Sequence, residues 1–155
     1  MKRITLFVFG LFVVLSWFSY GTAMMDYFLI YPSRAIVGAN EFVEYHNLLE
    51  RAILPVSVLP FLVITLLNAF LLWKRPAGVS GILLVISMVC LLIVWTSSIF
   101  IQIPMNIELG AGKNPALVQK VMDTNKVREV LETTQAVIVF VLLLQSLTFQ
   151  TNKNQ

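Results

Sequence analysis

The chain contains four long apolar stretches, which are separated by two polar segments and one short basic turn. The apolar stretches cover residues 4–25, 52–73, 77–103 and 133–149, and none of them contains Asp, Glu, Lys, Arg or His. A helix needs about 20 apolar residues to cross the hydrocarbon core of a bilayer, so the first three stretches are long enough by themselves. The fourth stretch is shorter and needs a helix that begins in the polar segment before it. The pattern therefore predicts four membrane-spanning helices.

The first polar segment, 26–51, is too polar to lie in lipid but keeps a helical periodicity. We expect an extended stretch that ends at residues 32–34, and then a helix that starts near Asn40, a residue type that caps helices. Four residues share the apolar face of this helix: Phe42, Tyr45, Leu49 and Ile53. Pro55 and Pro60 follow where the helix continues into the second apolar stretch, and they predict a kink there.

The second polar segment, 104–132, also predicts a helix that leads into an apolar stretch. Residues 110–114 have the composition of a loop, and Pro115 stands where the first turn of a helix tolerates proline. Both polar segments are thus expected to extend the bundle as helices.

Charged residues assign a side of the membrane to each segment. All eight acidic residues lie in segments 26–51 and 104–132. The basic residues near the termini and in the turn between the second and third stretches have no acid beside them: Lys2, Arg3, Lys74, Arg75 and Lys153. By the positive-inside rule, both termini and this turn are cytoplasmic, and both polar segments are extracytoplasmic. The pI near 9.2 then reflects orientation, and no nucleic-acid partner is expected.

Composition supports the same interpretation. With 58% hydrophobic residues among 155 and a mean hydropathy of +0.84, a soluble globular domain is excluded. We predict one integral membrane domain over residues 1–155 in the inner (plasma) membrane. Its fold class is all-α: a polytopic membrane four-helix bundle whose helical extracytoplasmic extensions cap one end. A cleavable signal peptide ending near residues 21–23 is the alternative for the first stretch, although that apolar run exceeds the usual length of about 7–15 residues.

Three groups of polar residues converge at the predicted extracytoplasmic end. They are Trp95, Ser98, Gln102 and Asn106 on the third helix; Asn125, Arg128, Glu132 and Gln135 on the fourth; and Glu41, Tyr45, His46, Glu50 and Arg51 before the second span. Spacings of three or four residues place each of the first two groups on one helical face. A bundle that turns these faces inward has a small pocket with amides, one imidazole and one guanidinium.

A purely structural role is the alternative for this set of residues. Amides between membrane helices commonly serve as interhelical hydrogen bonds, and Arg128 with Glu132 matches a surface ion pair at i and i+4. His46 is the only histidine and the best candidate for proton transfer, but a lone interfacial histidine is more commonly a packing or capping residue. Glu50 follows at i+4, yet two ligands do not make a metal site, and no phosphate, haem or zinc motif occurs. No metal and no cofactor are expected.

Several short motifs occur between residues 31 and 141. They are Tyr31-Pro32; Phe42-x-x-Tyr45-His46, followed by Arg51 and by Pro55 or Pro60; Trp95-Thr96-Ser97; Gln102-x-Pro104-x-Asn106; and Thr124-Asn125-Lys126-x-Arg128. In these motifs the chain resembles the small four-span bacterial membrane proteins related to the anthrone-oxygenase-like family. It departs from them at Asn106, where His is frequent, at Lys126, where an aromatic residue is usual, and at Glu132-Thr133, where Trp-Thr is expected.

The resemblance implies a four-helix membrane bundle with a helical outer cap. By analogy it also implies metal-free oxygenation of a polycyclic phenolic substrate. In such a reaction His46 would be the base, and the resulting oxyanion would be stabilised by Arg128, Gln102 and Asn125.

We therefore expect a polar pocket near the outer membrane surface that binds or oxidises a small aromatic or amphipathic molecule. His46 and Arg128 are the candidate catalytic residues, and the candidate ligand contacts are Tyr31, Tyr45, Trp95, Gln102, Asn106 and Asn125. Membrane lipid and a small aromatic or lipid-like ligand are the expected partners. The alternative is a non-catalytic accessory or assembly protein whose cap docks a partner. A small transporter is less favoured, because the spans lack the ionisable groups typical of transporter sites.

Overall fold

Residues 2–153, which the computed structural model describes, form helices joined by short connections. In chain order the elements are α1 (Lys2–Met25), η1 (Asp26–Ile30), α2 (Tyr31–Ile36), α3 (Phe42–Ile53), η2 (Leu54–Val58), α4 (Leu59–Trp73), α5 (Gly81–Ser97), η3 (Ser98–Gln102), α6 (Ile103–Leu109) and α7 (Pro115–Lys153). Elements that follow without a break join into four continuous helices, each long and apolar enough to cross a membrane: Arg3–Ile36, Phe42–Trp73, Gly81–Leu109 and Pro115–Lys153. The prediction of an all-α chain with four such helices is confirmed.

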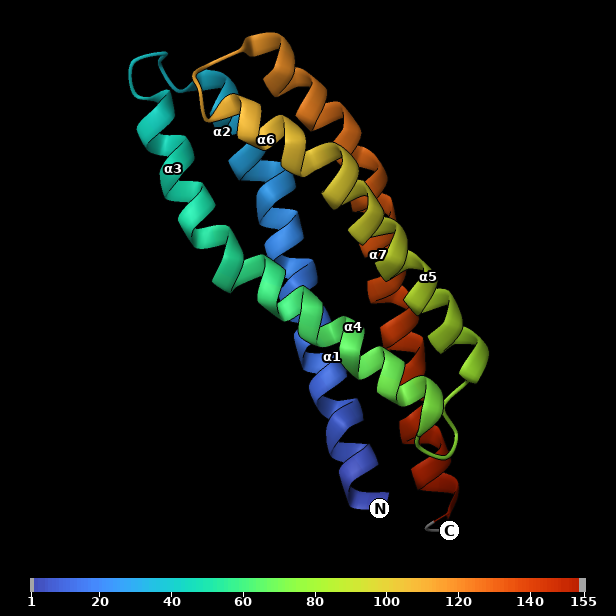
Figure 1. The fold of residues 1–155 in the computed structure, drawn as a ribbon. Helices are drawn as coiled ribbons and strands as arrows, with labels where there is room; N and C mark the ends of the chain where they lie inside the picture. Colours follow the sequence, from blue (N-terminus) through green and yellow to red (C-terminus); the bar gives the residue numbers. More distant parts are fainter. Residues whose placement is uncertain (1, 154–155) are drawn as a thin grey trace.

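The four helices run side by side, with both termini at one end and the loops 37–41 and 110–114 at the other (Figure 1). α5 packs along α7, while α1 packs against α4 and α7, and α4 also contacts α5. α3 diverges from the rest of the bundle toward the end with the two loops (Figure 1). Phe42, the first residue of α3, is nevertheless fully buried in a cluster with residues of α6 and α7.

Each of the elements η1, η2 and η3 is a single π-helical turn, and a proline is the second residue after each one: Pro32, Pro60 and Pro104. Proline has no backbone N–H, and its ring collides with the carbonyl four residues earlier in an α-helix. Hydrogen bonds from residue i+5 to residue i widen the turn and accommodate the ring. The distortion expected at Pro55 and Pro60 is present as η2.

This effect of proline corrects the expectation for segment 26–51. The segment is helical as far as Ile36 and not extended before residues 32–34, because η1 accommodates Pro32 within a continuing helix. α3 then begins at Phe42 without a side-chain cap, so Asn40 does not cap it. In the second polar segment, by contrast, the helix begins at Pro115 as predicted.

A second correction concerns the turn between α4 and α5. Residues 77–80 are not helical, and α5 begins at Gly81. Gly78 adopts φ +84°, a conformation that favours glycine. Ser80 then caps α5, because its hydroxyl accepts a hydrogen bond from the Leu83 N–H at 3.4 Å.

Two clusters of buried apolar side chains hold the helices together. The cluster nearer the termini contains Phe9, Phe12, Ile64, Leu71, Val79, Leu84, Leu91, Ile138, Val139 and Leu142. The cluster at the opposite end contains Tyr31, Phe42, Met105, Leu109, Leu117, Val118 and Val121. Between these clusters every helix contributes a belt of more polar side chains, and this belt contains the candidate site.

Candidate functional site

A cavity of about 270 Å³, here named the chamber, lies in the polar belt between the two apolar clusters. Its volume is just below the range of about 300–1,000 Å³ that is typical of small-molecule sites. All four helices line it, and its polar and aromatic lining residues include Asp26, Tyr31, Arg34, Glu50, Ser57, Phe61, Trp95, Ser98, Gln102, Asn106, Arg128 and Glu132. The chamber thus gathers charged groups from segments far apart in the sequence.

The three π turns contribute directly to the chamber wall. Asp26 belongs to η1, Ser57 to η2 and Gln102 to η3, and each of these residues lines the chamber. A π turn takes one residue more than an α turn and so rotates the residues after it by about 100° relative to those before. This rotation decides which side chains of the following helix face the chamber.

Arg34 on α2 is 5% exposed and is the most deeply buried charged residue of the chamber. Its Nη1 donates a hydrogen bond to Asn106 Oδ1 at 2.6 Å, and its guanidinium lies 5.3 Å from the centre of the Tyr31 ring. Its Nε has no hydrogen-bond partner among the described residues. Burying an unsatisfied donor costs about 1–3 kcal/mol, so this N–H leaves a chamber residue one hydrogen bond short.

Arg128 on α7 supplies the second guanidinium. Its Nη2 lies 3.4 Å from Glu132 Oε1, and its Nη1 donates to Asn125 Oδ1 at 3.3 Å. Both contacts are long for charge-assisted hydrogen bonds. Arg128 Nε, like Arg34 Nε, has no partner within the described chain. Asn125 does not line the chamber but holds Arg128 from outside it.

Gln102 and Trp95 form another part of the chamber wall. Gln102 is 3% exposed; its Nε2 donates to Thr124 Oγ1 at 2.9 Å, whereas its Oε1 has no partner among residues 2–153. Trp95 Nε1 donates to Thr65 Oγ1 at 3.1 Å, and its ring centre lies 5.4 Å from that of Phe61. This wall therefore presents an aromatic surface beside one unsatisfied acceptor.

His46 and Tyr45 on α3 lie outside the chamber lining. His46 is fully buried and stacks on Phe42 with ring centres 6.0 Å apart. Its Nε2 is 3.2 Å from Glu50 Oε1, but the direction of this contact does not make it a hydrogen bond. The Tyr45 hydroxyl bonds to the Ser33 hydroxyl. His46 thus lies outside the chamber, beside Glu50, which lines it.

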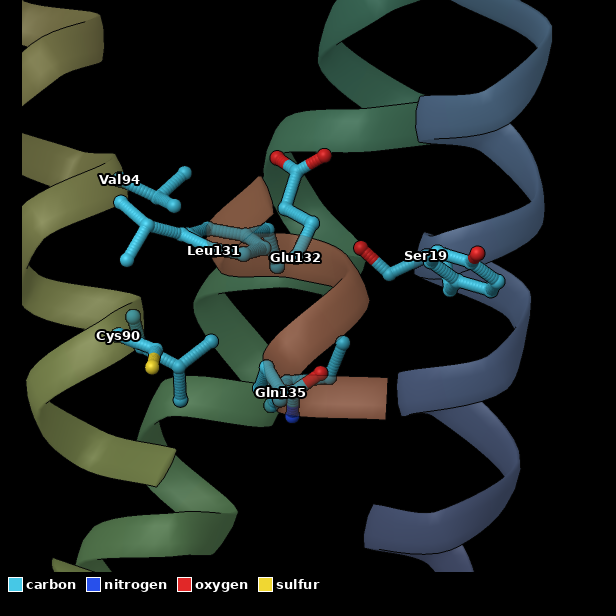
Figure 2. A pocket seen from close by; sticks show the side chains of 10 residues that line it. Ser19, Cys90, Val94, Leu131, Glu132 and Gln135 are labelled. Carbon is cyan, nitrogen blue, oxygen red and sulfur yellow. The ribbon is translucent and has the colours of Figure 1, made fainter. Parts of the chain in front are cut away.

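A water-sized void of about 10 Å³ adjoins the chamber on the side of the termini. Figure 2 shows Ser19 of α1 on one side of this void and Cys90 of α5 on the other, with Glu132 and Gln135 of α7 between them. Beyond it lies the apolar cluster nearer the termini. On the side of the termini, the chamber is therefore bordered by packed apolar side chains.

Of the eight candidate catalytic and ligand-contacting residues predicted from the sequence, five line the chamber: Tyr31, Trp95, Gln102, Asn106 and Arg128. Arg34 and Asp26 also line it, but sequence reasoning missed both of them. The signal was their spacing of eight residues, which places both on one face of a continuous helix. The sequence pattern predicts an extended stretch before Pro32, and in an extended stretch this spacing has no helical meaning.

Comparison of the chain with protein-family models, with curated proteins and with solved structures finds no match. Across residues 2–153, no three or more His, Cys, Asp or Glu side chains gather as metal ligands. The function is therefore inferred from the chemistry of the chamber residues.

Proposed function

We propose that this chain is a multi-pass membrane protein that binds a small amphipathic molecule, with the polar end of the molecule in the chamber. The observation that carries the proposal is the set of buried polar atoms without partners: Arg34 Nε, Arg128 Nε and Gln102 Oε1. Each unsatisfied buried group costs about 1–3 kcal/mol. A protein with well-packed apolar residues in place of these polar side chains would often be as stable as this one, or more stable. A polar ligand that satisfies these atoms offsets the cost.

The charge distribution supports an orientation in which the chamber lies near the outer surface. The basic residues that have no acidic residue near them in the sequence lie at the end with the termini. All acidic residues lie in the half with the chamber. By the positive-inside rule, both termini are then cytoplasmic in the inner membrane. α2, α6 and the first half of α7 form the extracytoplasmic cap in this orientation.

Oxidation of a bound phenolic molecule, which the sequence resemblance implies, would need a base at the chamber wall. Glu50 occupies that position, and His46 lies behind it at 3.2 Å. The function that we propose is binding. In an oxidation of the bound molecule, Glu50 and His46 would be the groups that transfer the proton.

The change Arg34→Gln tests the proposal because it removes the deepest charge of the chamber. We expect wild-type protein purified in a mild detergent to carry a small amphipathic molecule that mass spectrometry detects, and the folded Arg34→Gln variant to lose it. A ligand present at 100 times its Kd adds about 2.7 kcal/mol of stability, so thermal unfolding should report the same loss.

Lys126→Gln is the matched control, because Lys126 pairs with Asp123 at 2.8 Å on the exposed surface of α7. This variant should keep the molecule. The proposal fails if Arg34→Gln retains as much bound molecule as wild type. If changes on the cap surface instead remove a co-purifying protein, the chain is an accessory protein.

A further inference from the structure

The chamber opens sideways into a groove of about 580 Å³ between α1 and the helix formed by α3 and η2. Figure 1 shows α3 diverging from the bundle on this side. Beyond the residues it shares with the chamber, the groove is apolar, with walls formed by Trp17, Phe18, Met25, Ile30, Ala52 and Val56. Because both helices are of membrane-spanning length, such a groove faces the lipid.

Two opposite charges lie where the groove meets the chamber, since Asp26 and Arg34 line both. Neither belongs to an ion pair among the described residues. Arg128, by contrast, is 3.4 Å from Glu132, whereas Asp26 interacts with Arg34 and Arg128 only at longer range. Asp26 and Arg34 therefore complement a ligand head that carries a negative and a positive charge together.

The positive part of that head must also donate hydrogen bonds. Gln102 Oε1 is buried in the chamber without a donor, and the carboxylate of Asp26 accepts but cannot donate. A primary ammonium supplies three donors, whereas a trimethylammonium group supplies none. The negative part of the head must accept a hydrogen bond from Arg34 Nε, and a phosphate, whose oxygens guanidinium groups bind well, meets this requirement.

Building on the proposed function, we infer that the ligand is a zwitterionic membrane lipid whose head contains a phosphate and a primary ammonium. The phosphate binds Arg34, and the ammonium binds Asp26 and Gln102 Oε1. The acyl chains lie in the groove against the apolar side chains of α1 and η2. The lipid enters from the bilayer and does not pass through water.

Competition between lipids tests the assignment of the head. The full chain is reconstituted with equimolar dioleoyl phosphatidylethanolamine, phosphatidylcholine and phosphatidylglycerol, and native mass spectrometry counts the lipids that stay bound. We expect the amount of bound phosphatidylethanolamine to exceed that of bound phosphatidylcholine by about tenfold, a ratio that corresponds to about 1.4 kcal/mol of binding free energy. Asp26→Asn should reduce this preference and increase the share of anionic phosphatidylglycerol, whereas Asp123→Asn on the exposed surface should change nothing.

Two glycines of α1 test the groove. A Cβ added at Gly21 or at Gly10 meets no atom within 4 Å, so both positions accept a side chain without a clash. Gly21 lines the groove and Gly10 does not. Gly21→Phe should fill the groove and lower lipid retention at least fivefold, while Gly10→Phe should retain lipid like wild type.

Equal retention of phosphatidylcholine and phosphatidylethanolamine would overturn the assignment of the head, and full retention in Gly21→Phe would overturn the groove. A neutral alkylphenol is a separate probe. If it alone raises the unfolding temperature, and Arg34→Gln abolishes that rise, the binding function stands and the lipid inference is wrong. If neither the lipids nor the alkylphenol bind the wild-type protein, both proposals are overturned.

Discussion

At the residue scale, buried polar groups behave differently in the two halves of the bundle. Near the termini they satisfy one another: Asn68 Oδ1 accepts from the Ser87 hydroxyl at 2.9 Å while its Nδ2 donates to the Leu84 carbonyl at 3.3 Å, and Gln135 donates to Ser16 at 3.3 Å. In the chamber, Gln102 Oε1 has no partner among the described residues. Polar side chains of both halves thus join helices, but in the chamber Arg34 Nε, Arg128 Nε and Gln102 Oε1 are left without a partner among the described residues.

This contrast predicts different stability effects in the ligand-free protein. Asn68→Ala leaves Ser87 unpaired and a cavity behind, so the free energy of unfolding should fall by about 2–3 kcal/mol. Gln102→Met preserves volume and removes an unsatisfied acceptor, so it should stay within about 1 kcal/mol of wild type. Unfolding in mixed detergent micelles measures both values. An equal loss in the two variants would mean that Gln102 is structural.

At the element scale, the π turns determine which side chains reach the chamber. Without Pro104, an α-helix can continue from α5 through α6, and residues after η3 rotate by about 100°. Asn106 would then turn away from Arg34. Pro104→Ala should therefore lower retention of the bound amphiphile at least tenfold, and it should also lower the unfolding temperature, because the buried Met105 and Leu109 rotate together with Asn106.

Pro115→Ala is the control for this prediction. Pro115 is the first residue of α7, where the missing N–H breaks no helical hydrogen bond. The variant should unfold within about 0.5 kcal/mol of wild type and keep its ligand. Retention of the ligand in Pro104→Ala would show that η3 does not position the chamber residues.

At the scale of the whole molecule, the orientation gives a direct labelling prediction. Single cysteines in place of the exposed residues Asn40 and Ala111 should react with a membrane-impermeant maleimide in intact cells. A cysteine in place of the exposed residue Ala77 should react only after the membrane is permeabilised. The native Cys90 is buried and gives little background. The reverse pattern of labelling would contradict the proposed topology.

The sequence by itself determined the number of long apolar helices, because hydrophobic length is a property of contiguous residues. It also placed the polar residues of α7 on one face, since their spacing follows a regular helix. The group from Trp95 to Asn106 lines the chamber together although the π turn η3 interrupts the regular helix there. The sequence did not reveal that Arg34 belongs to the site. Its partner Asn106 lies 72 positions away along the chain, and Pro32 masked the helix that carries it.

Only the tertiary structure decided which faces meet, because three π turns shift the helical phase and α3 diverges from α1. The same geometry places His46 behind Glu50 and brings Asp26 and Arg34 to the mouth of the groove. Composition and local spacing contain no information about such distances between helices. They depend instead on how the two apolar clusters pack and on how each proline widens its helix.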